Sequence, residues 1–345
     1  MIKPFLVVAI ISLFLIGCSN NDTDATGQDL DHRSVDKDPV ESIDLGSEYM
    51  YPLTGMGTDE EPNNRIVSVM VNNHPEARPQ SGLSQADMVF EILSEGNTTR
   101  LLAMFQSQTP DVVGPVRSAR PYYFQLAGDY DAVYIYHGAA DFIENQLQQS
   151  GIDNLSGAQY DGDGHLFTRE AFRQAPHNSY LQFPAVTEVA EGRGYTMEKE
   201  YDPLNFDDVD RSDIVGDEVE EVTVSYGSDR VRYVYDETDE HYVRYNGNTQ
   251  TVEYGDETPI TLENVLIMET RHAVVDDQGR RDIDFESGGN AYLLQKGKVQ
   301  KVQWESVDGR IIPVRDGEPV DLLKGQTWIN VIPNNPGLSG ISEVE

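Results

Sequence analysis

Short apolar runs rich in valine, isoleucine and other β-forming residues set the pattern of the first half of the chain. They are IVSVMV (66–71), DMVFEIL (87–93), RLLAMFQ (100–106) and DAVYIY (131–136). Runs of this length and composition, bounded by turn-forming residues, predict strands. Apolar residues at helical spacing follow near 119–128, 142–151 and 184–194. Strands that alternate with helices predict an α/β domain over residues 51–199.

The second half of the chain has a different pattern, with few helical signals. An acidic stretch, residues 200–218, is predicted to be a linker or a long loop between the halves. Beyond it, runs such as EVTVSYG (221–227) and RVRYVYDE (230–237) are separated by Gly and Asp turns. Regular short strands predict a mainly-β domain over residues 219–345, folded as a sandwich or a partly closed barrel. The fold class expected overall is α+β, an α/β N-terminal domain followed by a mainly-β C-terminal domain.

The N-terminus has the composition of a bacterial export signal, predicted over residues 1–17. Lys3 supplies a positive charge, and the apolar run from Phe5 to Ile16 is too short to span a membrane. The next residues, Gly17 and Cys18, complete a sequence that resembles the lipobox of bacterial lipoproteins, in which the cysteine is diacylated. Cys18 is the only cysteine of the chain and stands at the cleavage position. Lipidation of Cys18 is therefore favoured over a cleaved secretory peptide with an incidental cysteine.

The segment after Cys18 is acidic and has few large apolar residues. Such a composition cannot bury enough surface to offset the entropy lost on ordering. Residues 18–50 are therefore predicted to be a disordered tether between a lipid and the folded protein. We expect the protein at the cell membrane, lipid-anchored and on the extracytoplasmic face.

The whole chain is strongly acidic, with 60 Asp and Glu residues against 25 Lys and Arg and a formal net charge of −35. Nucleic acid would be repelled, so no nucleic-acid partner is expected. The sequence lacks a nucleophile elbow, the H-E-x-x-H motif, a phosphate loop and the Rossmann glycine motif. YDGDGH (160–165) lacks the glycine and the acid that an EF-hand requires, and is interpreted as a polar surface turn. No cofactor and no metal site are expected.

Positive charge in the first domain is carried by arginine alone. No lysine occurs between Asp38 and Glu198, whereas eight arginines do, two of them in GPVRSARP (114–121). The planar guanidinium grips a carboxylate or a phosphate through two hydrogen bonds. Arginine placed so selectively suggests an anion-binding site. The predicted ligand-binding residues are Arg78, Arg100, Arg117, Ser118, Arg120, His137, His177 and Asn178.

The position of GPVRSARP along the chain favours Arg117 and Arg120 as the residues that grip the anion. In an open α/β sheet, ligands bind beyond the carboxyl ends of strands, and most of the candidate segments follow a predicted strand. The helix predicted next begins with Ser118 as its N-cap or with Pro121 as its first residue. In both cases free N–H groups and the positive end of the helix dipole lie beside the two arginines.

A structural role for the same arginines stays open. Glu91 lies in an apolar predicted strand, and a buried carboxylate requires a partner. Arg100, Arg117 or Arg120 is a candidate for that partner, in a structural ion-pair network.

Two further hypotheses concern function. An envelope hydrolase or transferase is one, with Glu91 or Glu95 as general base, His137 or His177 as acid–base partner and arginines as oxyanion stabilisers. A scaffold that recruits envelope proteins through the mainly-β domain is the other. No spacing in the sequence is diagnostic of catalysis, so a binding protein is favoured over an enzyme.

Several stretches together resemble the YerB-like lipoproteins, a bacterial family common in Bacillus and its relatives. They are ARPQSGLSQADMVFEILSEGNTTRLLAMFQS, GPVRSARPYYFQLAGDYDAVY, APHNSY, DDQGRRDIDF and GQTWINVIP. The resemblance extends from about Arg65 to Pro333, and it implies a surface lipoprotein of two domains of unknown function. Family members usually have Gly-Gly-Ser where this chain has Gly138-Ala139-Ala140, so no serine hydroxyl is expected beside His137.

We therefore expect a membrane-anchored lipoprotein that binds an anionic group of the cell envelope. A peptide carboxylate, a wall phosphate and a nucleotide-like phosphate all fit this chemistry. A protein partner is compatible with the same expectation.

Overall fold

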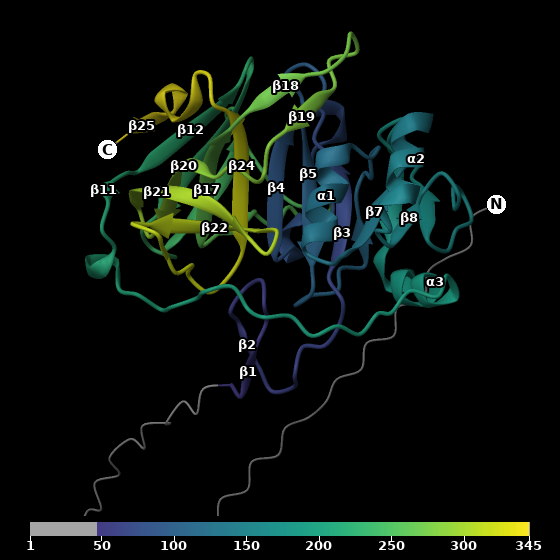
Figure 1. Cartoon of the computed structure of the whole chain (residues 1–345), viewed down its shortest axis with the longest axis horizontal. Helices are drawn as coiled ribbons and strands as arrows, with labels where there is room; N and C mark the ends of the chain where they lie inside the picture. Colours follow the sequence, from purple (N-terminus) through teal and green to yellow (C-terminus); the bar gives the residue numbers. More distant parts are fainter. Residues whose placement is uncertain (1–46, 345) are drawn as a thin grey trace, which may run out of the picture. The chain divides into compact units, whose positions relative to one another are not determined.

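A mixed sheet of twelve strands runs through the part of the chain that the computed structural model describes, residues 47–344 (Figure 1). The predicted signal peptide, Cys18 and nearly all of the predicted tether lie outside these described residues. The strand order is β23-β22-β21-β20-β17-β24-β4-β5-β3-β7-β8, with β11 paired to β21. Strands of both halves of the chain therefore belong to one sheet.

The strands and helices predicted in the first half are confirmed. The strands are β3 Val67–Asn72, β4 Met88–Leu93, β5 Thr99–Phe105, β7 Val133–Tyr136 and β8 Asn154–Ser156. The helices are α1 Pro121–Asp129, α2 Asp141–Ser150 and α3 Val186–Gly192. β4, β5 and β3 pair antiparallel, whereas β3, β7 and β8 pair parallel, with α1 before β7 and α2 before β8. Only this small part of the sheet has the parallel arrangement of an α/β protein.

The second half adds strands to the same sheet. They are β11 Asp217–Glu218, β17 Asn264–Thr270, β20 Gly289–Gln295, β21 Lys298–Val307, β22 Arg310–Arg315, β23 Glu318–Pro319 and β24 Thr327–Pro333. β24 lies between β17 and β4 and is parallel to both. The strands from β17 onward therefore do not form a separate sandwich or barrel. The mainly-β prediction for residues 219–345 is confirmed, but the described chain as a whole is mostly β, and a separate α/β first domain is not confirmed.

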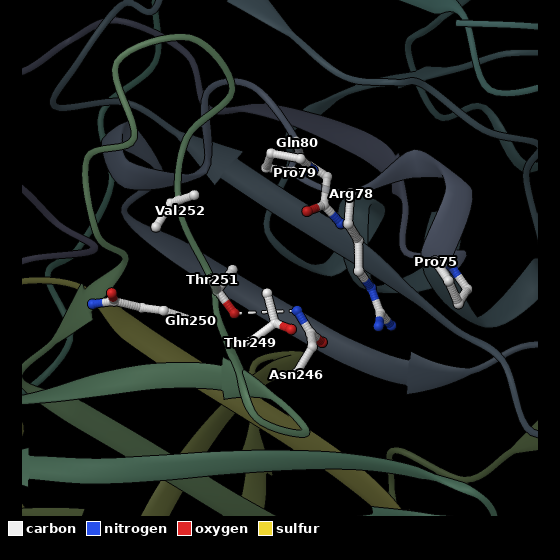
Figure 2. A pocket seen from close by; sticks show the side chains of 9 residues that line it. All are labelled: Pro75, Arg78, Pro79, Gln80, Asn246, Thr249, Gln250, Thr251 and Val252. Atoms are coloured by element: carbon white, nitrogen blue, oxygen red, sulfur yellow. Dashed lines mark hydrogen bonds between the residues drawn. The ribbon is translucent and has the colours of Figure 1, made fainter.

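A second sheet of six strands is antiparallel and comes from the second half. Its strands are β12 Glu221–Tyr226, β13 Asp229–Asp236, β14 His241–Asn246, β15 Thr249–Gln250, β16 Thr261–Leu262 and β25 Ser342–Val344. Residues 246–252 at one end of this sheet line a pocket together with residues 75–80 of the first half (Figure 2).

Smaller elements complete the fold. They are the pair β1 Tyr49–Met50 and β2 Gly57–Thr58, the sheet β6 Val112–Val113, β9 Phe167–Arg169 and β10 Ser179–Gln182, the hairpin β18 His272–Val274 and β19 Arg281–Ile283, and short 3-10 turns at Pro75–Ala77, Leu83–Gln85, Phe183–Ala185, Arg211–Asp213 and Gly337–Gly340. No helix within residues 47–344 has the length and apolar character needed to cross a membrane.

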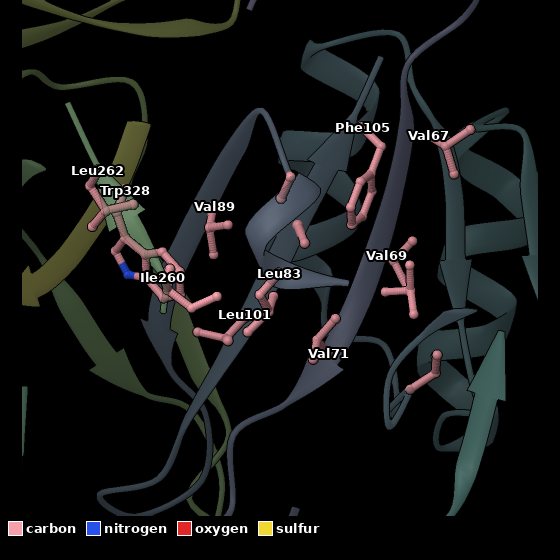
Figure 3. Close-up of a cluster of buried hydrophobic side chains, with 14 of the residues drawn as sticks. Val67, Val69, Val71, Leu83, Val89, Leu101, Phe105, Ile260, Leu262 and Trp328 are labelled. Atoms are coloured by element: carbon pink, nitrogen blue, oxygen red, sulfur yellow. The ribbon is translucent and has the colours of Figure 1, made fainter. Parts of the chain in front are cut away.

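The strands β3, β4, β5 and β7 of the twelve-stranded sheet are buried on both faces, which is why they appear in the sequence as continuous apolar runs. Val67, Val69 and Val71 lie on one face of the sheet and belong to the same buried core as Trp328 (Figure 3). Met70 points to the opposite face, where side chains of α1 and α2 cover the sheet. Both tryptophans, Trp304 and Trp328, are fully buried in the core.

Candidate functional site

The carboxyl ends of β3 and β7 meet at one edge of the twelve-stranded sheet, and the segment 114–118 lies along this edge. The backbone N–H of Arg117 donates to the carbonyl of Met70, and the N–H of His137 donates to the carbonyl of Arg117. Val116 forms a bridge with Val71. The structure therefore places Arg117 and His137 at neighbouring strand ends, the position expected of a ligand site in a sheet with parallel strands.

Arg117 has a free guanidinium in the described chain. Its side chain is partly buried and makes no hydrogen bond, ion pair or ring contact within residues 47–344. Burial and the neighbouring charge of Arg120 lower the pKa of Arg117, and Glu95 only partly opposes them. A half-buried cation without a hydrogen-bonding partner lacks the compensation that such groups normally have. An anion beside Arg117 would supply it.

Arg120 and Arg100 are used inside the protein. The Nε of Arg120 donates to Oε1 of Glu95, and Nη2 of Arg100 donates to Oε2 of the same carboxylate at 3.0 Å. Arg100 is only 7 % exposed, and burial and Arg120 lower its pKa to about 10. Of the two arginines of GPVRSARP, only Arg117 is available to a ligand.

Glu95 is held as a carboxylate by the arginines around it. Burial raises the pKa of Glu95, but Arg100, Ser94 and Arg120 together outweigh this effect and keep the pKa below its ordinary value. The structural ion-pair network predicted as an alternative therefore exists, but it is centred on Glu95.

Ser118 does not cap α1. The helix begins at Pro121, its N-cap is Arg120, and no side chain caps it. The carbonyl of Ser118 instead accepts a hydrogen bond from Nη1 of Arg100 at 2.5 Å. The role of Ser118 is therefore to hold Arg100 through its backbone, and the alternative start of the helix at Pro121 is confirmed.

His177 lies beside Asn72 at the end of β3. The side-chain N–H of Asn72 donates to Nδ1 of His177 at 2.8 Å, while Oδ1 of Asn72 accepts the backbone N–H of His74 at 3.0 Å. The second bond fixes the orientation of the amide, so Nδ1 of His177 must carry a lone pair. Neutral His177 then carries its proton on Nε2, which lies 3.4 Å from Oε2 of Glu76.

This arrangement makes His177 a hydrogen-bond donor to a ligand. Burial, His74 and Arg117 lower the pKa of His177, and protonation at Nδ1 would also set two donors against each other at Asn72. The ring of His74 stacks on that of His177 with centroids 4.9 Å apart. His177 therefore offers one N–H from a neutral ring, close to the charge of Arg117.

His74, Glu76 and His177 are also close enough to hold a metal ion, since one ligand atom of each lies within 4.8 Å of the others. A metal on Nε2 of His177 would require the proton to move to Nδ1, where the N–H of Asn72 already donates. Glu76 is also largely exposed, with 74 % of its side chain open to solvent. The tautomer of His177 thus disfavours a metal ion at these three residues.

His137 and Asn178 meet through Arg169, a residue that sequence reasoning did not select. Nη1 of Arg169 donates to Oδ1 of Asn178 at 2.9 Å, and Nη2 donates to Nε2 of His137 at 3.2 Å. Arg169 also grips Asp161 through two bonds of 2.6 and 2.9 Å. Burial and Arg169 lower the pKa of His137. The predicted polar surface turn thus contributes Asp161 to a cluster at the strand ends.

Arg78 lies apart from these residues. Its guanidinium lines the pocket of Figure 2 between residues 75–80 and 246–252. Burial and Arg244 lower the pKa of Arg78, and Glu91 and Asp229 oppose them. The candidates predicted from sequence therefore separate into a strand-end site, with Arg117, His137, His177 and Asn178, an internal pair, Arg100 and Arg120, and a pocket residue, Arg78.

Glu91 is not placed to act on a substrate. Its side chain is fully buried between the two sheets, and Oε2 lies 2.7 Å from Nη2 of Arg244. Oε2 also accepts from the indole of Trp328 at 3.1 Å, and Oε1 accepts from Asn73 and Thr99 at 3.0 and 2.9 Å. The partner of Glu91 is therefore an arginine of the second half, and none of the three arginines proposed from the sequence.

Asn72, Asp161 and Arg169 are the site residues that sequence reasoning missed. Asn72 directly follows the strand predicted over residues 66–71, so the position of the residue was a usable signal. Asp161 and Arg169 are eight residues apart and pair only because β9 returns beside the turn that holds Asp161. The periodicity of the sequence does not predict the contact between Asp161 and Arg169.

Comparison with known proteins shows what this chain is similar to. Residues 53–196 match the family described as "Protein of unknown function (DUF3048) N-terminal domain", and residues 222–329 match the C-terminal domain of the same family. The "Putative lipoprotein YerB" of Bacillus subtilis is 42 % identical over 296 residues, which are 84 % of this chain and 88 % of that protein.

A solved structure is similar as well. The crystal structure of YerB from Bacillus subtilis matches with a TM-score of 0.79 and 40 % sequence identity, and the match covers 86 % of this chain and all of that one. The two matched regions agree in outline with the predicted two-domain layout. The chain therefore belongs to the DUF3048 family, whose N-terminal and C-terminal domains it matches in order along its length.

Proposed function

We propose that this protein is a lipid-anchored lipoprotein of the extracytoplasmic face that binds an anionic ligand at the strand-end site. Two independent facts support the anchor. The relative from Bacillus subtilis carries the name of a lipoprotein, and the chain has a single cysteine, Cys18, directly after an apolar signal-like run.

The anchor has a direct test. Cys18→Ser should move the protein from the membrane fraction to the soluble fraction of cells, because the thiol that would carry the lipid is gone. Fractionation and immunoblotting measure this, with a serine-to-alanine change at Ser19 as the matched control. A Cys18→Ser protein that stays with the membrane to the same extent as the wild type would contradict the anchor.

The observation that carries the binding proposal is the free guanidinium of Arg117. Most other arginines of the first half have internal partners: Arg65 pairs with Asp131 and Asp153, Arg100 and Arg120 with Glu95, and Arg169 with Asp161. Arg117 sits among them with no partner in the described chain, beside a neutral imidazole N–H of His177. A fork-shaped cation and a single N–H donor form a complementary surface for a carboxylate or a phosphate.

A net charge of −35 makes such a site selective. Diffuse negative charge keeps polyanions such as nucleic acid away, so a ligand must gain its affinity from specific hydrogen bonds at Arg117 and His177. A small anionic group of an envelope component, a carboxylate or a phosphate, satisfies this requirement.

Arg117→Gln tests the proposal. The purified protein is titrated with inorganic phosphate and with N-acetylglycine at constant ionic strength, and amide chemical shifts at the strand-end site are followed by NMR. Loss of a charged hydrogen bond is worth about 1.5–3 kcal/mol, so the Kd should rise by roughly 10- to 100-fold. Arg117 has no internal partner to lose, and the stability of the variant should stay within about 0.5 kcal/mol of the wild type.

Arg230→Gln is the matched control, since Arg230 is exposed on β13 and the variant carries the same change in net charge. Its affinity should equal that of the wild type. A folded Arg117→Gln protein with unchanged affinity, or a wild type whose strand-end amides respond to neither anion, would overturn the proposal.

A further inference from the structure

A pocket of about 310 Å³ lies between the two halves of the chain, and Arg117 is not among the residues that line it. One wall comes from the segment after β3, with Pro75, Arg78 and Gln80, and the other from residues 246–252. In Figure 2 the side chains of Arg78 and Gln80 face those of Asn246, Thr249 and Thr251 across this space. Pockets at the junction of two structural units are a common place for small ligands.

The side chain of Asn73 holds Arg78 in place through a hydrogen bond to its Nε. The side-chain oxygen of Asn73 accepts Nε of Arg78 at 3.1 Å and Nε2 of Gln80 at 3.0 Å. The amide N–H of Asn73 in turn donates to Glu91 and Thr99 at 3.0 and 2.8 Å. A fully buried network thus fixes both pocket side chains before any ligand arrives, and preorganisation of this kind reduces the entropy lost on binding.

The terminal nitrogens of Arg78 remain available. Asp229 is the carboxylate within ion-pair range, at 3.8 Å from Nη2, which is too long for a hydrogen bond. The residues that line the pocket include no Asp or Glu, although the chain holds 60 acids. Arg78 is also the only cation among them. A single guanidinium matches a single negative charge, as in a carboxylate, better than a phosphate dianion.

The other residues that line the pocket indicate what kind of molecule the rest of the ligand is. Pro75, Pro79 and Val252 supply apolar surface, and Gln80, Asn246 and Gln250 supply side-chain amides. Apolar walls with amide groups suit a peptide, whose backbone offers both N–H and C=O groups to pair with them. No aromatic side chain lines the pocket to stack on a sugar ring.

We propose that this pocket binds the C-terminal carboxylate of a short peptide, with Arg78 paired to the carboxylate and the amides of Gln80 and Asn246 facing the peptide backbone. The site is distinct from the strand-end site. The charges that act on Arg78 are those of Arg244, Glu91 and Asp229, whereas those that act on Arg117 are Arg120 and Glu95.

Binding of N-acetyl-Ala-Ala, with a free carboxylate, is compared with binding of the same peptide as its C-terminal amide, by NMR titration of the purified protein. The acid should bind at least tenfold more tightly than the amide, with shifts at residues 78–80 and 246–252. Arg78→Gln should raise the Kd of the acid at least tenfold and remove the preference over the amide. The peptide carboxylate can also reach Arg117, so the affinity of the pocket is read only from the shifts of residues 78–80 and 246–252. Read in this way, Arg117→Gln should leave the values of the pocket unchanged and remove the shifts at the strand-end site alone.

A second variant keeps the proposal testable if the Arg78→Gln protein does not fold. Thr249→Trp places a large side chain in the pocket from the exposed strand β15, without touching the network of Asn73. It should abolish binding of the peptide while the thermal unfolding midpoint stays near that of the wild type. Equal binding of acid and amide, no response at millimolar peptide, tighter binding of glucuronate than of the peptide, or loss of binding in Arg117→Gln alone would each overturn the proposal.

Discussion

Replacing Arg244 by methionine should lower the free energy of unfolding by about 3–5 kcal/mol, because it leaves the carboxylate of Glu91 buried without its counter-charge. Glu91 is 0 % and Arg244 1 % exposed. The guanidinium also lies over the indole of Trp328, 4.5 Å from the ring centroid. This pair connects β4 of the large sheet to β14 of the six-stranded sheet, so its loss should loosen the contact between the two sheets.

Urea unfolding followed by tryptophan fluorescence measures this effect, since both tryptophans are in the core. Arg232→Met is the matched control: Arg232 pairs with Glu221 on the same sheet, but with side chains 26 and 23 % exposed, and its loss should cost about 1 kcal/mol or less. The double variant Glu91→Met and Arg244→Met should recover most of the stability, because an apolar pair removes both buried charges. An Arg244→Met protein as stable as the control would show that Glu91 does not depend on Arg244.

Glu95→Gln should have two effects of opposite sign, a loss of about 2–4 kcal/mol in stability and a gain in affinity for an anion. Glu95 neutralises Arg100 and Arg120 and is the carboxylate whose charge acts on Arg117. Without Glu95, three neighbouring guanidinium groups have no counter-charge. The folded protein is destabilised most at Arg100, because this arginine is buried. The same excess of positive charge should tighten phosphate binding at Arg117 several-fold at constant ionic strength.

The stability effect of Glu95→Gln should also depend on pH. The pKa of Glu95 lies below its ordinary value in the folded protein, so its contribution is present at neutral pH and is lost as pH falls through the lowered pKa. Wild type and variant should therefore converge in stability as pH falls below about 4. Glu188→Gln, at a largely exposed acid of α3, should change neither stability nor affinity. Weaker phosphate binding by Glu95→Gln would contradict the assignment of Arg117 as the anion site.

The strands of the large sheet were readable from sequence for a specific physical reason. The residues of β3, β4, β5 and β7 are buried on both faces, so every position must be apolar or internally paired, and a continuous run results. Glu91 is the exception in these runs. A carboxylate within a buried apolar run requires a buried partner, so its presence predicts one. The sequence showed that a partner must exist but not which residue it is, since Arg244 is 153 positions away along the chain.

The candidate site was also predictable in part, namely where the position of a residue depends on local sequence alone. Chain order placed Arg117 and His137 at strand ends, because the end of a strand is a local property. The distinction between Arg117, which is free, and Arg120, three residues later, is not local, since it depends on where the side chain of Glu95 lies. Asn72 and Arg169 take their roles from contacts with His177 and Asp161, which only folding brings near.

By itself the sequence determined the strands and helices of the first half, because composition and periodicity are local properties. It also showed that arginine, without lysine, carries the positive charge between Asp38 and Glu198. The export signal that ends at Cys18 stays a prediction. The tertiary structure decided that both halves share one sheet, that Glu95 occupies two of the arginines and leaves Arg117 free, and that Arg78 belongs to a pocket between the halves. Those outcomes depend on which side chains meet across long sequence separations. The energy of a charge pair depends on the distance between the charges in space, and the periodicity of the sequence carries no information about that distance.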